Sequence, residues 1–524
     1  MHSDLSALEF GGIQRLLEKL TSTPYGAEAA RNLTPAPTVA VARQMQTAVS
    51  AARTLIEAGN APKLERLPDI RAALRQAAQS GAALPGSALH NIRTVLATAA
   101  TLADVARQTP GLYAGASADL QAPADLPAAL AAALLPGGNI RHDANAALLR
   151  LHGEIETLRT ELQKLLKARL QANDLKGAVA SERVYWQGHR GMLSLSPAIA
   201  ERVKGVRRGA STNGREVIIE PLEAVGLNNK LESLGGQQEL EQQLLRRSLT
   251  DAVRAHGAAL ARIVEAITWI DLALAGGHLS VHLNATPPEF VAAPRIELDR
   301  AYHPAMLLQF AQGQGPRPVP LSVALDDAQP MLLITGPNTG GKTVVLKTVG
   351  LLVTMAYCGL HLPVEGRCVI GDFTRVIVGI GDAQSLQHHL STFAGHVEVL
   401  KRLLHEADAG TLVLMDELGT GTDPEEGAAL AMAVLDELSE RRVRGIVTTH
   451  LPPLKGYAER HPALQNASMH FDRASLAPTY RLEVGVSGRS LGLVIAGQRG
   501  LPDTLLDRAR AHLRAINPHR QGDE

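Results

Sequence analysis

The sequence has little that would stabilise a small secreted domain or place the chain in a membrane. It has two cysteines, Cys358 and Cys368, which are too few for a disulfide framework and lack metal-ligand spacing. No stretch of about 18 or more uncharged apolar residues suggests a membrane span, and the N-terminus has no basic-then-apolar signal pattern. These absences favour a cytoplasmic protein with no membrane partner.

Aromatic residues and net charge are also scarce. Aromatics make up 3% of the chain, and 52 Lys and Arg balance 52 Asp and Glu. A nucleic-acid partner would therefore need a local basic surface, because the global charge gives no attraction. At 524 residues the chain is too long for one core, and about three domains are expected.

The first part of the chain reads as helices. From residue 5 to about 135, apolar residues recur at spacings of three and four, and segments such as "TSTPYG" and "LPGG" supply the stops. We therefore predict an α-helical core domain over 1–143.

Two long helical segments come next. An a/d heptad seam predicts an outgoing lever helix over 144–171, and a looser apolar stripe predicts a returning one over 223–280. The seam consists of Leu148, Leu151, Ile155, Leu158, Leu162 and Leu165, and the stripe of Leu227, Leu231, Leu234, Leu240 and Leu244.

The segment between these helices, residues 172–222, is here called the tip. "RVYWQGHRGMLSLS" and "NGREVIIEP" read as short strands, so the helices and the tip describe a lever with a clamp; a self-contained coiled-coil hairpin is the alternative. The tip also holds the best basic patch, suited to non-specific phosphate contacts, although a solvated loop would look the same. Its basic residues are Arg202, Lys204, Arg207, Arg208 and Arg215.

From about residue 285 to 512 the pattern is α/β, with short apolar runs typical of buried parallel strands, and 513–524 reads as a polar tail. The expected fold is therefore multidomain. An α-helical core and lever domain with coiled-coil arms and a small β-containing clamp precedes an α/β domain. That domain contains the glycine-rich sequence "GPNTGGKT", which indicates a P-loop ATPase domain.

The chemistry centres on "GPNTGGKT", which follows an apolar strand and precedes a helical run. Such a loop directs backbone N–H groups and a helix N-terminus at phosphate oxygens. Lys342 should reach the β- and γ-phosphates, and Thr343 should bind Mg²⁺. The predicted nucleotide-binding residues are Gly336, Pro337, Asn338, Thr339, Gly340, Gly341, Lys342, Thr343 and Val344.

Two further strand ends complete a hydrolytic site. "TLVLMDEL" places Asp416 where it can help to hold Mg²⁺, and Glu417 where it can orient or activate water. "TTH" ends the next strand, with His450 positioned to sense the γ-phosphate. Lys342, Glu417 and His450 are the predicted catalytic residues, and Thr343 and Asp416 the predicted metal ligands.

The segment "GDAQSLQHHLSTFAGH" lies between these motifs. Ser391 is well placed as a helix N-cap or an anion contact. His388 and His389 are adjacent and do not share a helix face, so they read as surface or loop residues and not as metal ligands.

Together, "TGPNTGGKT", "GDAQSLQHHLSTFAGH", "LMDELGTGTDPEEG" and "TTHLPPLKGYA" resemble the MutS ATPases of the ABC class. The segments "GTGTDPEEG", "LPPLKGYA" and "NGREVIIEPLEAVGLNN" are similar to those of the second bacterial MutS branch, which is associated with recombination control and ribosome rescue. The resemblance runs from near the N-terminus to about residue 510.

The resemblance implies a homodimer with ATP and Mg²⁺ sandwiched between two ATPase domains. Ser391 and Thr392 of one subunit would approach the γ-phosphate held by the other, and Asn338 would add a polar contact. The implied dimer seam comprises Gly419, Thr420, Gly421, Thr422 and Asp423.

Two departures from the family pattern matter. The lever-like helices begin almost at Met1, which leaves no room for a mismatch-reading domain. The second branch usually continues into an Smr nuclease domain, whereas this sequence stops at Glu524, so either it is truncated or this member lacks that domain. We expect neither mismatch recognition nor nuclease activity of this chain.

The leading hypothesis is a homodimeric ATPase that clamps branched or structured nucleic acid, either DNA recombination intermediates or the ribosomal RNA of collided ribosomes. The sequence does not choose between these targets. One alternative is an ABC- or SMC-like structural ATPase that bridges partners without gripping nucleic acid. A metabolic P-loop kinase is disfavoured, because no acceptor pocket is evident and Glu417 suits water activation.

Overall fold

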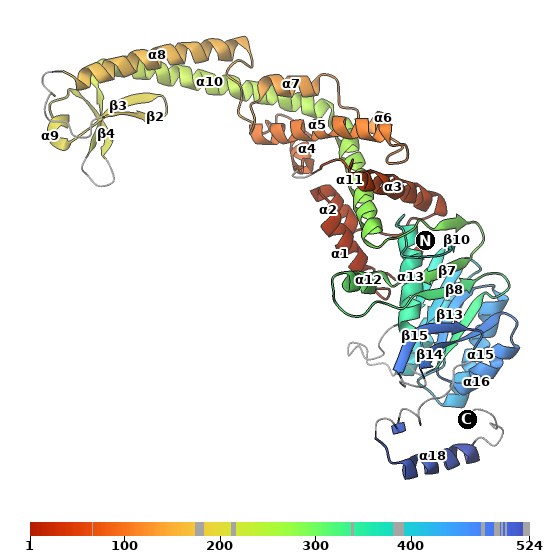
Figure 1. The fold of residues 1–524 in the computed structure, drawn as a ribbon. Helices are drawn as coiled ribbons and strands as arrows, with labels where there is room; N and C mark the ends of the chain where they lie inside the picture. The colour runs from red at the N-terminus through yellow and green to blue at the C-terminus, as the bar shows by residue number, and fades with distance from the viewer. Residues whose placement is uncertain are drawn as a thin grey trace. The chain divides into compact units, whose positions relative to one another are not determined.

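A computed structural model of the chain describes residues 1–64, 67–172, 175, 183–210, 216–336, 340–380, 392–472, 477–486, 493, 496–497 and 500–516. The chain divides into two compact units (Figure 1). The first contains Met1–Arg66, Asp104–Ala116 and Ala266–Glu524, and the second contains Leu67–Ala103 and Ser117–Glu265.

The first unit is built on a seven-stranded sheet in the order β1-β11-β12-β13-β9-β14-β15. All neighbours pair in parallel except β14 and β15, so most strands have their carboxyl ends at the same edge. The strands are β1 (His2–Ser3), β9 (Met331–Thr335), β11 (Arg375–Gly379), β12 (Thr411–Met415), β13 (Arg444–Thr449), β14 (Leu464–Asp472) and β15 (Ala477–Val484).

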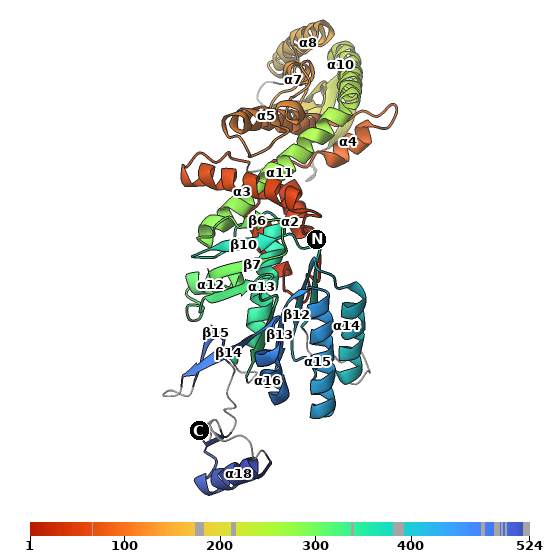
Figure 2. The same cartoon turned by 90° about the vertical axis from the view of Figure 1, so that its right-hand side faces the viewer.

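Helices cover both faces of this sheet, as the buried apolar strands require. The helix α13 (Lys342–Tyr357) packs on one face, where Leu346 and Leu352 join the core. On the other face, Leu403, Leu435 and Leu454 come from three helices that lie together in Figure 2. Those helices are α14 (Thr392–Glu406), α15 (Pro424–Glu440) and α16 (Pro452–Arg460).

A four-stranded sheet, in the order β6-β10-β7-β8, adjoins this core and contributes Ile296 and Ile370 to it. Its strands are β6 (Glu289–Val291), β7 (Ile296–Ala301), β8 (Leu321–Leu325) and β10 (Cys368–Gly371), and the remaining elements of the first unit are α1 (Gly11–Leu20), α2 (Pro24–Arg31), α3 (Val39–Glu57), α12 (Pro304–Ala311) and α18 (Asp503–Ile516).

The N-terminal residues belong to the first unit, together with the large sheet. The strand β1 pairs in parallel with β11, and Phe10, Ile13 and Leu17 are buried in the same core as α13. The first unit thus contains residues 1–66 together with 266–524, and apolar residues of both parts share one core. The domain boundaries that the sequence indicates stay a prediction.

The second unit contains two antiparallel helices, α8 (Ala146–Leu170) and α10 (Leu222–Ala255). Asn145 at the start of α8 contacts Glu241, and Arg169 near its end pairs with Glu223 at the start of α10. The shorter helices α4 (Arg71–Ala77), α7 (Leu126–Ala133) and α9 (Pro197–Ala200) belong to this unit, whereas α5 (Gly86–Gln108), α6 (Ala116–Asp119) and α11 (Gly257–His282) cross the division.

The buried seam of α8 differs from the prediction at its end, where Leu166 is buried and Leu165 only partly so. On α10, Leu231 and Leu234 are buried, but the predicted apolar stripe is not buried along its whole length. Its last two members, Leu240 and Leu244, are 58% and 50% exposed.

The returning helical run is also interrupted, since α10 ends before His256 and α11 begins at Gly257. His256 has left the α-helical conformation, and glycine, a poor helix former, follows it. The predicted helix over 223–280 is therefore two helices.

The tip folds as a four-stranded antiparallel sheet in the order β2-β3-β5-β4, and it packs on both long helices. The Arg159 guanidinium of α8 lies 4.7 Å from the Trp186 ring centroid. At Gly235 of α10, an added Cβ would lie 2.3 Å from the His189 ring. The strands are β2 (Arg183–Gln187), β3 (Arg190–Leu195), β4 (Gly205–Ala210) and β5 (Val217–Pro221).

A buried histidine gives the first unit a pH-dependent stability. His361 is 3% exposed and lies between Ser50 Oγ, 2.8 Å from Nε2, and Ser280 Oγ, 2.7 Å from Nδ1. Burial, assisted by the Arg53 charge, lowers the pKa of His361 from 6.5 to about 4. Between pH 6.5 and pH 4, His361 binds a proton in the unfolded chain but not in the folded chain. The stability that His361 contributes is therefore full above pH 6.5 and is lost as the pH falls toward 4.

We expect the free energy of unfolding to fall by about 2 kcal/mol between pH 7.5 and pH 5 through His361. Urea denaturation at the two pH values measures this, with His361→Gln as the comparison. The variant should be less stable at pH 7.5 but should show a flatter pH dependence. Equal pH dependence in the two proteins would contradict the assignment.

Two sequence expectations concern the ends and the membrane. Within the part of the chain that the structure describes, no helix is long and apolar enough to span a bilayer. The predicted polar tail overlaps α18, which continues to Ile516, and residues 517–524 lie outside the described residues.

Candidate functional site

The carboxyl ends of three adjacent parallel strands bring together the motifs that the sequence singles out. The strand β9 ends at Thr335 before the glycine-rich loop, β12 ends at Met415 before Asp416, and β13 ends at Thr449 before His450. Because β9 and β12 both pair with β13, these loops lie next to one another at one sheet edge. Open parallel sheets bind ligands at this edge.

The loop after β9 depends on its glycines. Gly336 has φ 129° and Gly341 has φ 93°, conformations that favour glycine, and Gly341 is the N-cap of α13. At Gly340, an added Cβ would lie 2.9 Å from Met469 Cβ. The described glycines therefore let the main chain pass close to the N-terminus of α13. Pro337, Asn338 and Thr339 lie outside the described residues.

Lys342 places a cation inside this loop. Its side chain is 1% exposed, and its ammonium donates to the carbonyl oxygens of Gly336 and, at 3.4 Å, Thr449. Burial lowers the pKa of Lys342, while the charges of Asp416 and Glu417 act in the opposite direction. A phosphate in the loop would supply the negative charge that this buried ammonium lacks.

Thr343 and Asp416 meet beside the loop. The Thr343 hydroxyl donates to Asp416 Oδ2 at 2.6 Å, so one hydroxyl and one carboxylate converge on one position. Oxygen ligands of this kind suit Mg²⁺, which usually takes one or two carboxylates and completes its shell with substrate phosphates. Among the described residues no group of three or more His, Cys, Asp and Glu could hold a metal by itself. The hydroxyl and the carboxylate fit a Mg²⁺ ion whose other ligands come from nucleotide phosphates and water.

Glu417 has a left-handed backbone, with φ 54°. Its N–H donates to Thr448 Oγ1 at 2.9 Å, and its carbonyl oxygen accepts from Thr420 Oγ1 at 2.9 Å. Such a conformation costs a non-glycine residue roughly 1 kcal/mol or more and is frequent at functional sites. Hydrogen bonds to two threonine hydroxyls therefore hold the Glu417 backbone in this conformation.

The remaining predicted residues of this edge are placed less specifically. His450 follows β13, Val344 lies on the first turn of α13, and both are exposed. Neither has a contact within the described residues that fixes a role. Ser391 lies outside the described residues, and Thr392 is described only as the first residue of α14.

The predicted dimer seam, 419–423, forms a tight loop. At Gly419 an added Cβ would lie 2.5 Å from the Gly427 carbonyl oxygen, and at Gly421 it would lie 3.2 Å from Phe393 N. Asp423 caps α15 by accepting from Glu425 N–H at 2.9 Å. The loop thus connects the Glu417 segment to the starts of α14 and α15. Its role in a dimer stays a prediction.

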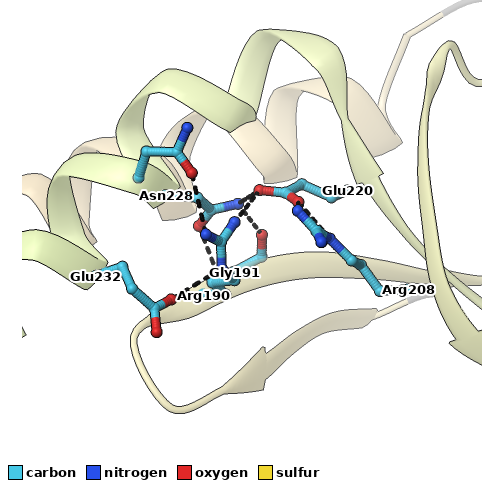
Figure 3. Close-up of polar contacts among 7 residues, drawn as sticks. Arg190, Gly191, Arg208, Glu220, Asn228 and Glu232 are labelled. Carbon is cyan, nitrogen blue, oxygen red and sulfur yellow. Dashed lines mark hydrogen bonds and ion pairs between the residues drawn. The ribbon is translucent and has the colours of Figure 1, made fainter.

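The tip contains a second polar centre, which the sequence did not reveal. Glu220 is fully buried and accepts from Arg190 at 2.9 Å, from Arg208 at 2.6 Å and from Asn228 at 2.8 Å (Figure 3). Asn228 also bonds both backbone groups of Gly191, which joins α10 to β3. Burial opposes ionisation of Glu220, but hydrogen bonds from Arg208 and Asn228 and the Arg190 charge hold its pKa below the ordinary value.

This centre separates the predicted nucleic-acid contacts into two kinds. Arg208 is the extra residue at a β-bulge between β4 and β5, which turns its side chain toward Glu220. Arg202, Lys204 and Arg207 are exposed and make no ion pair within the described residues. Arg215 lies outside the described residues.

The sheet, the loop and the paired carboxylates define a P-loop ATPase domain. A family model described as MutS domain V matches residues 332–517. Two curated proteins named Endonuclease MutS2 match nearly the whole chain. The protein of Symbiobacterium thermophilum is 36% identical over 511 residues, which cover 97% of this chain and 63% of the relative. That of Thermus thermophilus is 36% identical over 519 residues, covering 98% and 66%.

The chain therefore belongs to the MutS family, in the MutS2 branch. A third relative of the same name, from Carboxydothermus hydrogenoformans, is 36% identical over 379 residues, which cover 72% of this chain and 48% of the relative. The chain spans less than two thirds of the length of these relatives.

Proposed function

We propose that this chain forms a homodimeric ATPase that clamps branched or structured nucleic acid and uses ATP to open and close the clamp. One observation carries the ATPase part: Lys342, the Thr343–Asp416 pair and the fixed Glu417 meet at one sheet edge. The family membership supports the use of ATP.

The roles follow from the chemistry of each side chain. Lys342 neutralises phosphate charge, and Thr343 and Asp416 hold Mg²⁺, which supplies electrostatic stabilisation of the transferred phosphoryl group. Glu417 orients water for attack, and His450 senses the γ-phosphate. A carboxylate beside the metal residue suits hydrolysis better than transfer to a second substrate.

The dimer completes the site in this proposal. Ser391 and Thr392 of one subunit contact the nucleotide held by the other, and the loop 419–423 lines the seam. The support is the loop's position between Glu417 and the start of α14, where Thr392 lies.

The tip is the proposed nucleic-acid contact. Every residue of β4 from Val206 to Ala210 is exposed, so this edge strand packs its side chains on no core. Lys204 and Arg207 offer charges that no carboxylate of the described residues neutralises. We propose DNA junctions or ribosomal RNA as targets. The word endonuclease in the relatives' name describes those proteins, and we propose no cleavage step for this chain.

Replacing Lys204 and Arg207 together by Gln should weaken nucleic-acid binding and lower the slope of log affinity against log salt by about 2. The thermal unfolding temperature should not change, because both side chains are exposed. Binding is measured on duplex DNA, four-way junctions and ribosomes side by side, with a non-hydrolysable ATP analogue present.

Two matched variants sharpen this test. Arg15→Gln with Lys19→Gln removes the same charge from the exposed side of α1 and should leave binding unchanged. Arg208→Gln should instead destabilise the protein by roughly 1–2 kcal/mol, a figure lowered for a side chain that is 40% exposed. Unchanged affinity and salt slope in the Lys204 and Arg207 variant would remove the tip from the proposal.

A second candidate function has one observation in its favour. Leu240 and Leu244 are exposed one turn apart on α10, a feature that suits a protein partner better than a phosphate backbone. A structural ATPase that bridges proteins would bind its partner through this surface and would not need the charges of the tip. If the ATPase is active and no nucleic acid is bound, this alternative is favoured.

A further inference from the structure

One threonine connects the two acidic residues of the candidate nucleotide site. Thr448 lies on β13, beside the end of β12, and its side chain is fully buried. Its Oγ1 accepts the Glu417 N–H at 2.9 Å and donates to Asp416 Oδ1. A hydroxyl has one donor and two acceptor positions, so both bonds form at the same time.

The bond to Asp416 fixes the direction of a carboxylate. Asp416 Oδ1 receives the Thr448 hydroxyl, and Oδ2 receives the Thr343 hydroxyl at 2.6 Å. With a hydroxyl on each oxygen, the carboxylate plane has one orientation. When a cation replaces the Thr343 proton as partner of Oδ2, the bond from Thr448 still holds Oδ1. Partners of this kind typically change metal affinity or activity 10- to 100-fold when removed.

The bonds to the following residues fix the backbone that carries Glu417. Thr448 receives two consecutive N–H groups, that of Glu417 on its hydroxyl and that of Leu418 on its carbonyl oxygen at 2.9 Å. The left-handed conformation of Glu417 needs such support from its surroundings.

The same strand end also reaches the other parts of the site. Thr449 O accepts from the Lys342 ammonium at 3.4 Å, and His450 is the next residue. A change at the end of β13 therefore acts on Lys342, Asp416 and Glu417 together.

We propose that Thr448 is a positioning residue, which aligns the Asp416 carboxylate for Mg²⁺ and holds Glu417 in its left-handed conformation. This rests on the proposed ATPase function. A residue needed only for packing would be replaced without loss by valine, which has the same shape and no hydroxyl. The hydroxyl is the feature that the proposal requires.

The test compares Thr448→Val with Thr448→Ser. The valine variant should need about 10-fold more Mg²⁺ to bind a fluorescent non-hydrolysable ATP analogue, with unchanged binding of that analogue in excess EDTA. Its kcat for ATP should fall about 10- to 100-fold with a smaller change in KM. The serine variant should restore both quantities to within about 3-fold of the original protein.

Thr354→Val is the matched control. Thr354 is also buried in the first unit, on α13, and its hydroxyl has no partner within the described residues. Its replacement should change neither the Mg²⁺ requirement nor turnover. If Thr448→Val behaves like Thr354→Val, or if serine does not rescue, the positioning role is wrong.

A readout without nucleotide keeps the proposal separate from ATP hydrolysis. Thr448→Val should lower the Tm of the apo protein, and it should lower it less in a Glu417→Gly background, where glycine no longer needs support for a positive φ. Equal Tm losses in both backgrounds would contradict the backbone role. If the original protein binds Mg²⁺–nucleotide but never hydrolyses ATP, the proposed function fails, and the Mg²⁺ titration still decides the role of Thr448.

Discussion

Replacing Glu417 by Gln should reduce ATP turnover about 100- to 1000-fold while leaving Mg²⁺–ATP binding intact. Glutamine keeps the size and the left-handed backbone that Thr448 and Thr420 hold, but it cannot accept a proton from water. The variant should therefore accumulate a nucleotide-bound dimer that the original protein forms only transiently. Single-turnover hydrolysis and sedimentation in the presence of ATP measure the two effects.

Glu425→Gln is the matched control for this variant. Glu425 is exposed on the first turn of α15, so Glu425→Gln makes the same change of charge at a residue with no proposed role in hydrolysis. It should hydrolyse ATP at close to the original rate. Unchanged turnover in Glu417→Gln would remove Glu417 from the mechanism and favour a water held by other groups.

The sequence predicted which motifs meet at the candidate nucleotide site, because the signals of those motifs are local. The spacing of Gly336, Gly341 and Lys342 encodes the loop within eight residues, and Asp416 directly follows a buried strand. The carboxyl ends of parallel strands share one edge, so a strand-by-strand prediction places both motifs at that edge. The contact between Thr343 and Asp416 also requires β9 and β12 to flank β13, which no local pattern announces.

Thr448 and Glu220 were missed because their roles depend on contacts far along the chain. Thr448 acts on Glu417, 31 residues away, only because β12 and β13 are neighbours in the sheet. Glu220 attracts Arg208 only because a β-bulge turns that side chain, and no local pattern announces a bulge there. A basic run on its own could not separate the paired Arg208 from the unpaired Arg207.

The apolar stripe predicted for the returning helix was wrong at its last two positions, where helical periodicity does not coincide with burial. Apolar residues at helical spacing can face solvent, as Leu240 and Leu244 of α10 do. Residues 1–66 join the core of the large sheet through strand β1 and through apolar residues such as Phe10, and periodicity alone does not assign these residues to a sheet.

Mixing two inactive variants should restore activity if the site is completed between subunits. Lys342→Ala removes the buried cation of the loop, and Ser391→Ala removes the proposed contact from the partner, so each homodimer has two defective sites. In the mixed dimer one site receives both defects and the other receives none. Random mixing at equal concentration should therefore restore roughly a quarter of the original activity, since half the dimers carry one intact site.

The pattern of rescue distinguishes a shared site from a site within one chain. Mixing Lys342→Ala with Glu417→Gln provides the comparison, because both residues belong to the same half-site. In that mixed dimer each site keeps one defect, and no rescue is expected. Rescue in the first mixture alone would assign Ser391 to the partner's nucleotide. If neither mixture is rescued although a tag demonstrates mixed dimers, Ser391 acts on the nucleotide that Lys342 of its own chain binds.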